Sequence, residues 1–359
     1  KHKLEQKSVL IGMSGGVDSS VAAALLKEQG YHVIGATMRL WTYSDSCNMK
    51  HEGCCAESAV EDARRVCDKL GIDFYVMNFK DMFKDKVVDY FVDEYIHGRT
   101  PNPCIACNKY LKFDALLKKA LAMGIDYVAT GHYAKIEKGE DGKYILRASE
   151  AVKKDQSYVL YNFTQEQLAH TLMPLGGYNK DWVRQKAEEL GLGVAHKPDS
   201  QEICFVEDDD YAKFITDYSG YKPKEGDILD VNGNVIGKHR GLIYYTIGQR
   251  KGIGAYGRPM FVMKIDAENN TITLGEKGME FSNELTAYDV NFVSGEFPKE
   301  NMLITAKVRY QAPPAAAMLC PQKDGTVKLM FPEPQRAVTP GQAVVFYDGD
   351  IVLGGGTVL

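Results

Sequence analysis

The chain has 359 residues, of which 45% are hydrophobic and 25% are charged, and it carries a formal net charge of −5. This length suits two or three domains, and the composition is that of an ordinary globular protein. The negative net charge argues against a uniformly basic nucleic-acid-binding protein, although local basic patches can still bind RNA.

Membrane and secretory signals are not recognisable in the sequence. No apolar run approaches the roughly 18 residues of a membrane span, and no signal peptide precedes the first predicted strand. We therefore expect a cytoplasmic protein without a membrane partner. The eight cysteines then indicate thiol chemistry in a reducing compartment instead of a framework of structural disulfides.

The first chemical signal is a glycine-rich loop near the N-terminus. A short apolar run over residues 9–13 is followed at once by the sequence SGGVDSS of residues 14–20. A segment rich in alanine and leucine then ends at Gly30, which predicts a strand, a tight loop and a helix with Asp18 or Ser19 near its N-cap. Inward-turned backbone N–H groups and the helix N-terminus should bind an anion such as a phosphate. No lysine follows the glycines, so this is not a Walker-type loop; the alternative is a plain glycine-rich turn.

Strands and helices alternate over roughly the first 200 residues. We expect strands over residues 32–40, 74–79 and 127–130, and helices over residues 57–70 and 81–97. This alternation predicts an α/β fold with a doubly wound parallel sheet, in which ligands bind beyond the carboxyl ends of the strands. The loop at 14–19, Met38 and Gly131 all follow strand ends, and we expect them to meet in one nucleotide pocket.

A second loop, over residues 100–109, contains a C-x-x-C pair. The prolines at 101 and 103 hold the preceding residues extended, and the helix that follows should stop at Gly124. Cys107 then lies near a helix N-terminus and beside Lys109, and both features favour the thiolate. The alternatives are a buried structural cysteine or half of a zinc site. No second C-x-x-C and no H-x₃₋₅-H follows, which disfavours zinc.

These motifs resemble those of known enzymes. The SGGVDS loop resembles the signature of the N-type ATP pyrophosphatases (PP-loop enzymes), which adenylate a carbonyl oxygen and release pyrophosphate. Residues 102–113 resemble the catalytic loop of the bacterial tRNA-specific 2-thiouridylase family (MnmA, also called TrmU). Further matches follow in chain order at residues 131–134, 154–158, 197–205, 248–252, 308–310 and 339–342. The resemblance therefore covers nearly the whole chain.

The resemblance implies an ATP-dependent sulfurtransferase that uses ATP and Mg²⁺. It would adenylate the C2 carbonyl oxygen of the wobble uridine in a tRNA anticodon and replace that oxygen with sulfur. Cys107 would be the nucleophile, and Cys204 would carry the sulfur as a persulfide, so that AMP leaves and a Cys107–Cys204 disulfide remains. The implied partners are the anticodon arm of tRNA and a persulfide sulfur donor or relay protein.

The resemblance and the strand-end argument also assign binding residues. ATP would contact Gly12, Met13, Ser14, Gly15, Gly16, Val17, Asp18, Ser19, Met38 and Gly131, with Asp18 helping to hold Mg²⁺. The target base would contact Asn102, Pro103 and Cys104. The tRNA would contact His132, Lys154, Asp155, Gln156, Arg309, Tyr310 and Gln342. The alternatives are a satisfied core histidine at His132 and a solvated turn with a cap at residues 154–156.

Cys104 departs from the family pattern, in which many members have a proposed base, Asp, at this position. Cys104 is therefore either a replacement for that base or, with Cys107 and Cys204, a ligand of an iron–sulfur cluster that transfers sulfide. Other PP-loop ligases and amidases remain rival functions, but they need no thiol pair. Among the other cysteines, Cys67 should belong to the core and Cys320 should be inert. Cys54 and Cys55, with His51 nearby, are ambiguous between a structural and a metal-binding role.

Beyond Asp210 the sequence becomes mostly β, with turn signals between short alternating segments. We predict a catalytic domain over residues 1–210, a central β-rich domain over 211–280 and a tRNA-binding C-terminal β-barrel over 281–359. Basic and aromatic residues interleave near residues 239–240, 250–251 and 307–310, which is a modest indication of RNA binding.

Overall fold

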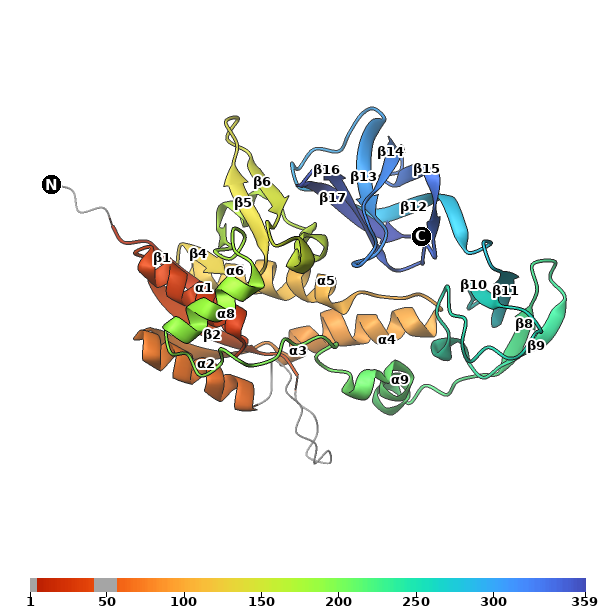
Figure 1. The fold of residues 1–359 in the computed structure, drawn as a ribbon, viewed down its shortest axis with the longest axis horizontal. Coiled ribbons are helices and arrows are strands. Elements are labelled where there is room, and N and C mark those ends of the chain that lie inside the picture. Colours follow the sequence, from red (N-terminus) through yellow and green to blue (C-terminus); the bar gives the residue numbers. More distant parts are fainter. Residues whose placement is uncertain (1–4, 42–56) are drawn as a thin grey trace.

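The computed structural model describes residues 5–41 and 57–359, so the predictions for His51, Cys54 and Cys55 lie outside the described residues. The molecule is elongated, with a parallel-sheet domain at one end and a small four-stranded sheet at the other (Figure 1). A barrel lies above the region between them (Figure 1).

The parallel sheet has the strand order β3-β2-β1-β4-β7, and all of its pairings are parallel. Its strands are β1 (Ser8–Gly12), β2 (His32–Arg39), β3 (Asp73–Asn78), β4 (Tyr127–Ala129) and β7 (Thr171–Leu172). Successive residues of β1 point to opposite faces, and both faces are covered. Val9 and Ile11 pack in one core cluster while Leu10 packs in the other. This double burial explains why β1 is a continuous apolar run.

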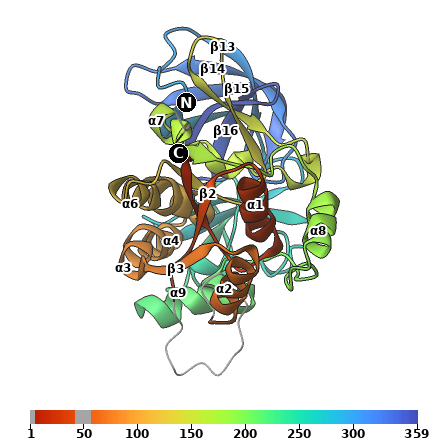
Figure 2. The same ribbon diagram turned by 90° about the vertical axis from the view of Figure 1, so that its left-hand side faces the viewer.

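Helices cover both faces of this sheet, which confirms the doubly wound architecture (Figure 2). One face holds α1 (Val17–Glu28), α2 (Glu57–Leu70) and α8 (Lys180–Glu189). The other face holds α3 (Lys80–Phe83), η1 (Lys84–Val88), α4 (Asp89–Ile96), α5 (Pro103–Cys107), η2 (Asn108–Ala115), α6 (Leu116–Ala122) and α9 (Tyr211–Ser219). Short helices lie in the connections between these elements. They are the 3₁₀ helices η3 (Val152–Lys154), η4 (Ser157–Leu160), η5 (Glu207–Asp209) and η6 (Leu242–Tyr244) and the α-helix α7 (Gln165–Ala169).

Two details of the helices differ from the sequence prediction. Helix α1 has Gly16 as its N-cap, so it starts before Asp18 and Ser19. The segments predicted as plain helices over 81–97 and after Asn102 both contain a π-helical stretch, η1 and η2. Apolar periodicity does not distinguish a local π-turn from the α-helix around it, and such turns are frequent at functional sites.

The C-terminal barrel is closed, as predicted. Its order is β12-β15-β14-β13-β16-β17, and a pairing of β12 with β17 closes it. The strands are β12 (Phe281–Phe292), β13 (Met302–Lys307), β14 (Ala315–Pro321), β15 (Val327–Arg336), β16 (Ala343–Asp348) and β17 (Ile351–Val358). A hairpin of β5 (Ala134–Lys138) and β6 (Tyr144–Ala148), which the sequence did not predict, joins this sheet through Arg147 and Ile351. The first 200 residues thus contribute strands to the barrel sheet.

The middle sheet has the order β10-β11-β8-β9 around a core that includes Ile228, Val262, Ile272 and Leu274. Its strands are β8 (Gly226–Leu229), β9 (Val235–His239), β10 (Met260–Asp266) and β11 (Thr271–Glu276). In the described part of the chain, no helix is both long enough and apolar enough to span a membrane.

Candidate active site

The glycine-rich loop closes on itself through serine side chains. The backbone N–H of Ser14 donates to Oγ of Ser19 at 3.2 Å, and the N–H of Gly16 donates to Oγ of Ser14 at 3.3 Å. Gly15 has φ +79°, and a Cβ there would collide with the backbone of Ala59 in α2. Glycine is therefore required at this position for both its conformation and the close approach.

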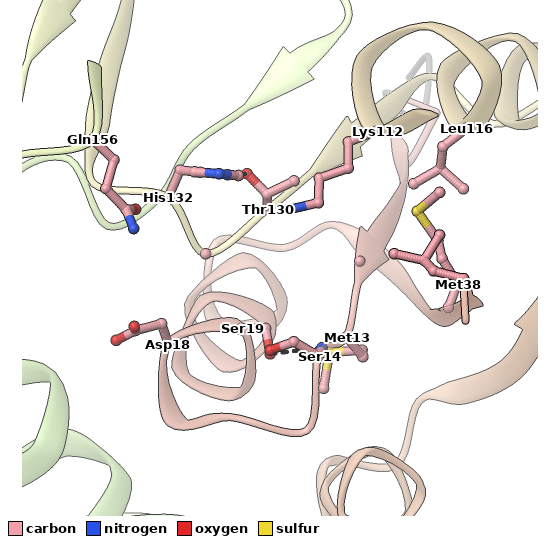
Figure 3. A pocket seen from close by; sticks show the side chains of 14 residues that line it. Met13, Ser14, Asp18, Ser19, Met38, Lys112, Leu116, Thr130, His132 and Gln156 are labelled. Carbon is pink, nitrogen blue, oxygen red and sulfur yellow. Dashed lines mark hydrogen bonds between the residues drawn. The ribbon is translucent and has the colours of Figure 1, made fainter. Parts of the chain in front are cut away.

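The carboxyl ends of β1, β2 and β4 meet at a cavity of about 200 Å³. Its lining includes seven of the predicted nucleotide-contacting residues: Gly12, Met13, Ser14, Asp18, Ser19, Met38 and Gly131 (Figure 3). Gly15, Gly16 and Val17 do not line it, and Val17 is buried in the core. A Cβ on Gly131 would lie 2.7 Å from the backbone N of Ser19, so the segment that follows β4 packs directly on the start of α1.

The carboxylate of Asp18 is held by two side chains from later elements. The Tyr133 hydroxyl donates to its Oδ1 at 2.7 Å, and Nζ of Lys180 lies 2.7 Å from the same atom. Burial, together with the charge of Asp18, raises the pKa of the Tyr133 hydroxyl, so this group remains a donor. A carboxylate has further acceptor capacity, so Asp18 can still bind a cation on its open side.

Lysines reach the loop from outside its own sequence. Nζ of Lys180, at the start of α8, is paired with Asp18, and its side chain is 11% exposed. Nζ of Lys197 lies 2.8 Å from Oδ2 of Asp62 and 3.4 Å from the carbonyl oxygen of Gly15. Lys112, from η2, lines the cavity beside Thr130 and His132 (Figure 3). The sequence analysis assigned no role at the loop to these lysines. Lys197 is the first residue of the matching motif at 197–205, whereas no local sequence pattern marks Lys180.

Cys107 and Cys204 pack against the same apolar cluster. Cys107 is the last residue of α5 and is 8% exposed, and Cys204 is half-buried beside Phe205. Neither cysteine lines the cavity. The fold thus places two cysteines that are far apart in sequence on one apolar cluster, which also contains Met38 and Leu116 of the cavity wall.

Cys104 lies one helical turn before Cys107 and has an exposed face. Surrounding protein atoms raise the pKa of the Cys104 thiol, and the positive charge of Lys112 acts in the opposite direction. Within residues 5–41 and 57–359, no three His, Cys, Asp or Glu side chains are grouped as ligands for a metal ion. As positioned, Cys104, Cys107 and Cys204 therefore do not fit an iron–sulfur cluster.

The remaining described cysteines neither line the cavity nor belong to the cluster of Cys107 and Cys204. Cys67 is fully buried, and burial raises its pKa to about 12, so the prediction of a core residue is confirmed. Cys320 is half-buried in β14 of the barrel.

The loop before α5 is held by the barrel. Asn102 is extended, as the proline after it predicts, and caps the helix by accepting a hydrogen bond from the N–H of Ile105 at 3.2 Å. The helix starts at Pro103, because proline fits the first position of a helix. Nε2 of Gln342 donates to the carbonyl oxygen of Thr100 at 3.0 Å. Gln342, predicted as a tRNA contact, thus binds the loop before α5 in this structure.

The other predicted tRNA contacts lie at two places. His132 and Gln156 line the cavity, and burial and the charge of Lys112 lower the pKa of His132 to about 3. The Asp155 carboxylate accepts hydrogen bonds from the backbone of Ser149 and from Ser157 and so caps its turn. Arg309 and Tyr310 follow β13, and the Tyr310 hydroxyl donates to the carbonyl oxygen of Asp155 at 3.0 Å. Lys154 is paired with Asp199.

Three family models match the chain. They are described as the tRNA methyl transferase HUP domain over residues 7–208, the tRNA methyl transferase PRC-barrel domain over residues 212–276 and the aminomethyltransferase beta-barrel domain over residues 282–358.

Full-length relatives share more than half of their residues with the chain. One from Acetivibrio thermocellus is 59% identical over 358 residues, which cover 99% of this chain and 100% of the relative. Another from Clostridioides difficile is 58% identical over 354 residues, which cover 98% of each chain. A third, from Clostridium botulinum strain Alaska E43, is 57% identical and covers 99% of this chain and 98% of the relative. All three are named tRNA-specific 2-thiouridylase MnmA.

Proposed function

Because the chain belongs to the tRNA-specific 2-thiouridylase (MnmA) family, we propose that it is an ATP-dependent sulfurtransferase that exchanges O2 of the wobble uridine in tRNA for sulfur. The observation that carries this proposal is the 59% identity over 99% of the chain. The anion-binding loop and the two cysteines on one apolar cluster supply the two kinds of chemistry that such an exchange needs.

The first step of the proposed reaction activates the oxygen. O2 of the uracil attacks the α-phosphorus of ATP, pyrophosphate leaves, and the base carries an adenylate on that oxygen. Backbone N–H groups of the loop and the ammonium groups of Lys180 and Lys197 would offset the negative charge of the phosphates. Mg²⁺, held by Asp18 and phosphate oxygens, would supply further charge neutralisation.

The second step delivers sulfur. The outer sulfur of a Cys204 persulfide attacks C2, and AMP leaves with the former carbonyl oxygen. The Cys107 thiolate then attacks Sγ of Cys204 and breaks the S–S bond, which leaves the thiocarbonyl and a Cys107–Cys204 disulfide. The electrons balance because two thiols are oxidised while the sulfane sulfur is reduced to the level of sulfide. An external thiol must then reduce the disulfide before the next turnover.

Partners follow from the same chemistry. We propose that the anticodon arm binds across the turn at Lys154, Asp155 and Gln156, His132 and the barrel residues Arg309, Tyr310 and Gln342. A persulfide donor or relay protein in the cytoplasm would reload Cys204. We also propose that residues 1–210 form the catalytic domain and that residues 211–280 form an adaptor domain. The barrel over residues 281–359 would bind the tRNA.

Mass spectrometry of tRNA after incubation with ATP and a persulfide source tests the proposal. We expect 2-thiouridine at the wobble position, with AMP and pyrophosphate released in equal amounts. Asp18→Ala should lose AMP formation and keep its fold, because Lys180 retains Asp199 as a partner. Release of ADP and phosphate, or transfer of an amine instead of sulfur, would indicate another kind of PP-loop enzyme.

A further inference from the structure

The carboxylate of Asp199 is shared by three cations. Oδ2 lies 2.8 Å from Nζ of Lys154, and Oδ1 lies 2.7 Å from Nζ of Lys180 and 3.2 Å from a guanidinium nitrogen of Arg184. The Asp199 side chain is 23% exposed. Burial tends to raise the pKa of Asp199, but the hydrogen bonds from Lys154 and Lys180 outweigh it and lower the pKa below its usual value.

This cluster joins three functional parts of the molecule. Lys154 belongs to the turn proposed to contact tRNA, and Lys180 is also paired with Asp18 of the nucleotide loop at 2.7 Å. Asp199 itself lies five residues before Cys204 in the chain. Arg184 also donates to the carbonyl oxygens of Ala195 and Lys197, each at 3.0 Å, so α8 fixes the backbone that leads to the sulfur-carrying segment.

The contacts of the cluster differ in exposure. The side chain of Lys180 is 11% exposed, whereas that of Lys154 is 42% exposed. An exposed ion pair contributes little to stability, so a competing anion in solution can displace it. Lys154 is therefore the cation that an RNA phosphate can remove from Asp199, while Lys180 and Arg184 stay in place.

We propose that Asp199 is a latch carboxylate, which competes with the RNA backbone for Lys154 and, through Lys180 and Arg184, positions the segment that carries Cys204. This inference rests on the proposed function, because the role of Lys154 as an RNA contact comes from it. Binding of tRNA would then change the ion pairs of Asp199, next to the nucleotide loop and ahead of the sulfur carrier. Asp199 acts through its partners, so it is a positioning residue.

Asp199→Asn separates the effect of Asp199 on tRNA affinity from its effect on thiolation. The amide keeps the size of the side chain but loses its charge. We expect tRNA to bind more tightly, by about twofold to fivefold, since Lys154 is released from an exposed ion pair. Thiolation at saturating tRNA should fall by roughly tenfold, because Lys180 and Arg184 lose the charge that holds the segment. A merely structural loss would weaken tRNA binding and thiolation together, and that result would overturn the proposal.

Asp350→Asn is the matched control. It makes the same change in net charge and removes an equally short ion pair, 2.7 Å from Arg147, between the β5–β6 hairpin and the barrel. It should leave tRNA affinity at the wild-type value. In the Lys154→Met background, Asp199→Asn should no longer tighten tRNA binding. A gain that persists without Lys154, or that Asp350→Asn reproduces, would show a general charge effect and refute the latch.

Lys154→Met alone provides a second test if Asp199→Asn does not fold. It should weaken tRNA binding and lower the salt dependence by about one counterion. Its KM for tRNA should rise by a larger factor than its kcat falls, because Asp199 keeps Lys180 and Arg184. A kcat that falls by as large a factor as KM rises would contradict the latch. If wild-type protein does not thiolate tRNA at all, the proposed function fails first; if it does and these variants behave like wild type, only the latch fails.

Discussion

The Tyr133 hydroxyl donates a 2.7 Å hydrogen bond to Oδ1 of Asp18 and so ties the segment after β4 to the nucleotide loop. Tyr133 is 1% exposed, and the backbone N–H of Tyr133 donates to Oε1 of Gln156, which lines the cavity. Residues from three separate stretches thus depend on one buried tyrosine. The position of the Asp18 carboxylate is therefore set by the tertiary fold as well as by the loop.

The first prediction concerns that bond. Tyr133→Phe removes a hydrogen bond to a charged acceptor, which is worth about 1.5–3 kcal/mol. If most of this acts on the bound nucleotide, tRNA-dependent AMP formation should fall by roughly 10- to 100-fold. Tyr256→Phe is the control, because it removes a 2.9 Å hydrogen bond to the carbonyl oxygen of Ile253 in the segment before β10. Equal AMP formation by both variants would mean that Tyr133 does not position Asp18.

Local sequence signals predicted the nucleotide loop because its elements are contiguous. The helix expected over residues 57–70 matches α2, since its apolar period and its glycine stop lie within one segment. The β5–β6 hairpin was missed because its partner strand, β17, begins at residue 351, and periodicity carries no information about such distant pairing. Lys180 was missed for the same reason, since only the packing of α8 beside α1 places it at Asp18.

The second prediction tests how the barrel holds the loop before α5. Gly341 has φ +91°, and a Cβ there would lie 2.9 Å from both N and O of Thr100. Gly341→Ala should lower the free energy of unfolding by more than the roughly 1–3 kcal/mol of backbone strain and should slow thiolation. Gly325→Ala has similar strain at φ +85° but open space around its Cβ, so it should keep thiolation. Thermal unfolding measures the stability of the two variants, and turnover measures their thiolation. Equal turnover in the two variants would refute a role for the contact between Gly341 and Thr100.

The third prediction concerns acid stability. The pKa of His132 is about 3 in the folded protein, below its ordinary value of 6.5, because the residue is buried near Lys112. The unfolded chain therefore binds a proton at His132 that the folded chain does not, and stability falls as pH drops from 6.5 toward 3. Denaturant unfolding at about pH 7 and pH 5 should show a smaller loss for His132→Gln than for wild type. His196→Gln, at a side chain that is 85% exposed, should lose as much stability as wild type. If His132→Gln and wild type lose the same free energy of unfolding between about pH 7 and pH 5, His132 is not held as a neutral imidazole.

The fourth prediction concerns the thiol pair. Cys107→Ser and Cys204→Ser should each eliminate thiolation, because the proposed mechanism uses each sulfur once in every turnover. Both variants should still release pyrophosphate in the first step, since neither residue lines the cavity. Cys320→Ser, in the barrel, should retain thiolation. Peptide mapping of oxidised wild type should show a Cys107–Cys204 cross-link, and normal thiolation by Cys204→Ser would mean that sulfur arrives by another route.

The last prediction decides what Cys104 does. We propose Cys104 as the proton acceptor of the persulfide route, although burial on balance raises the pKa of its thiol against the charge of Lys112. No group of three ligands is formed in the described part of the chain. Cys104→Ala should therefore slow thiolation by roughly 10²- to 10⁴-fold at most, which is the usual contribution of a general base, and should leave the Cys107–Cys204 cross-link intact. Iron and sulfide analysis after anaerobic purification checks the alternative. Stoichiometric iron that disappears, together with all activity, in Cys104→Ala would replace the persulfide route with a cluster, because a base variant has no reason to lose a metal.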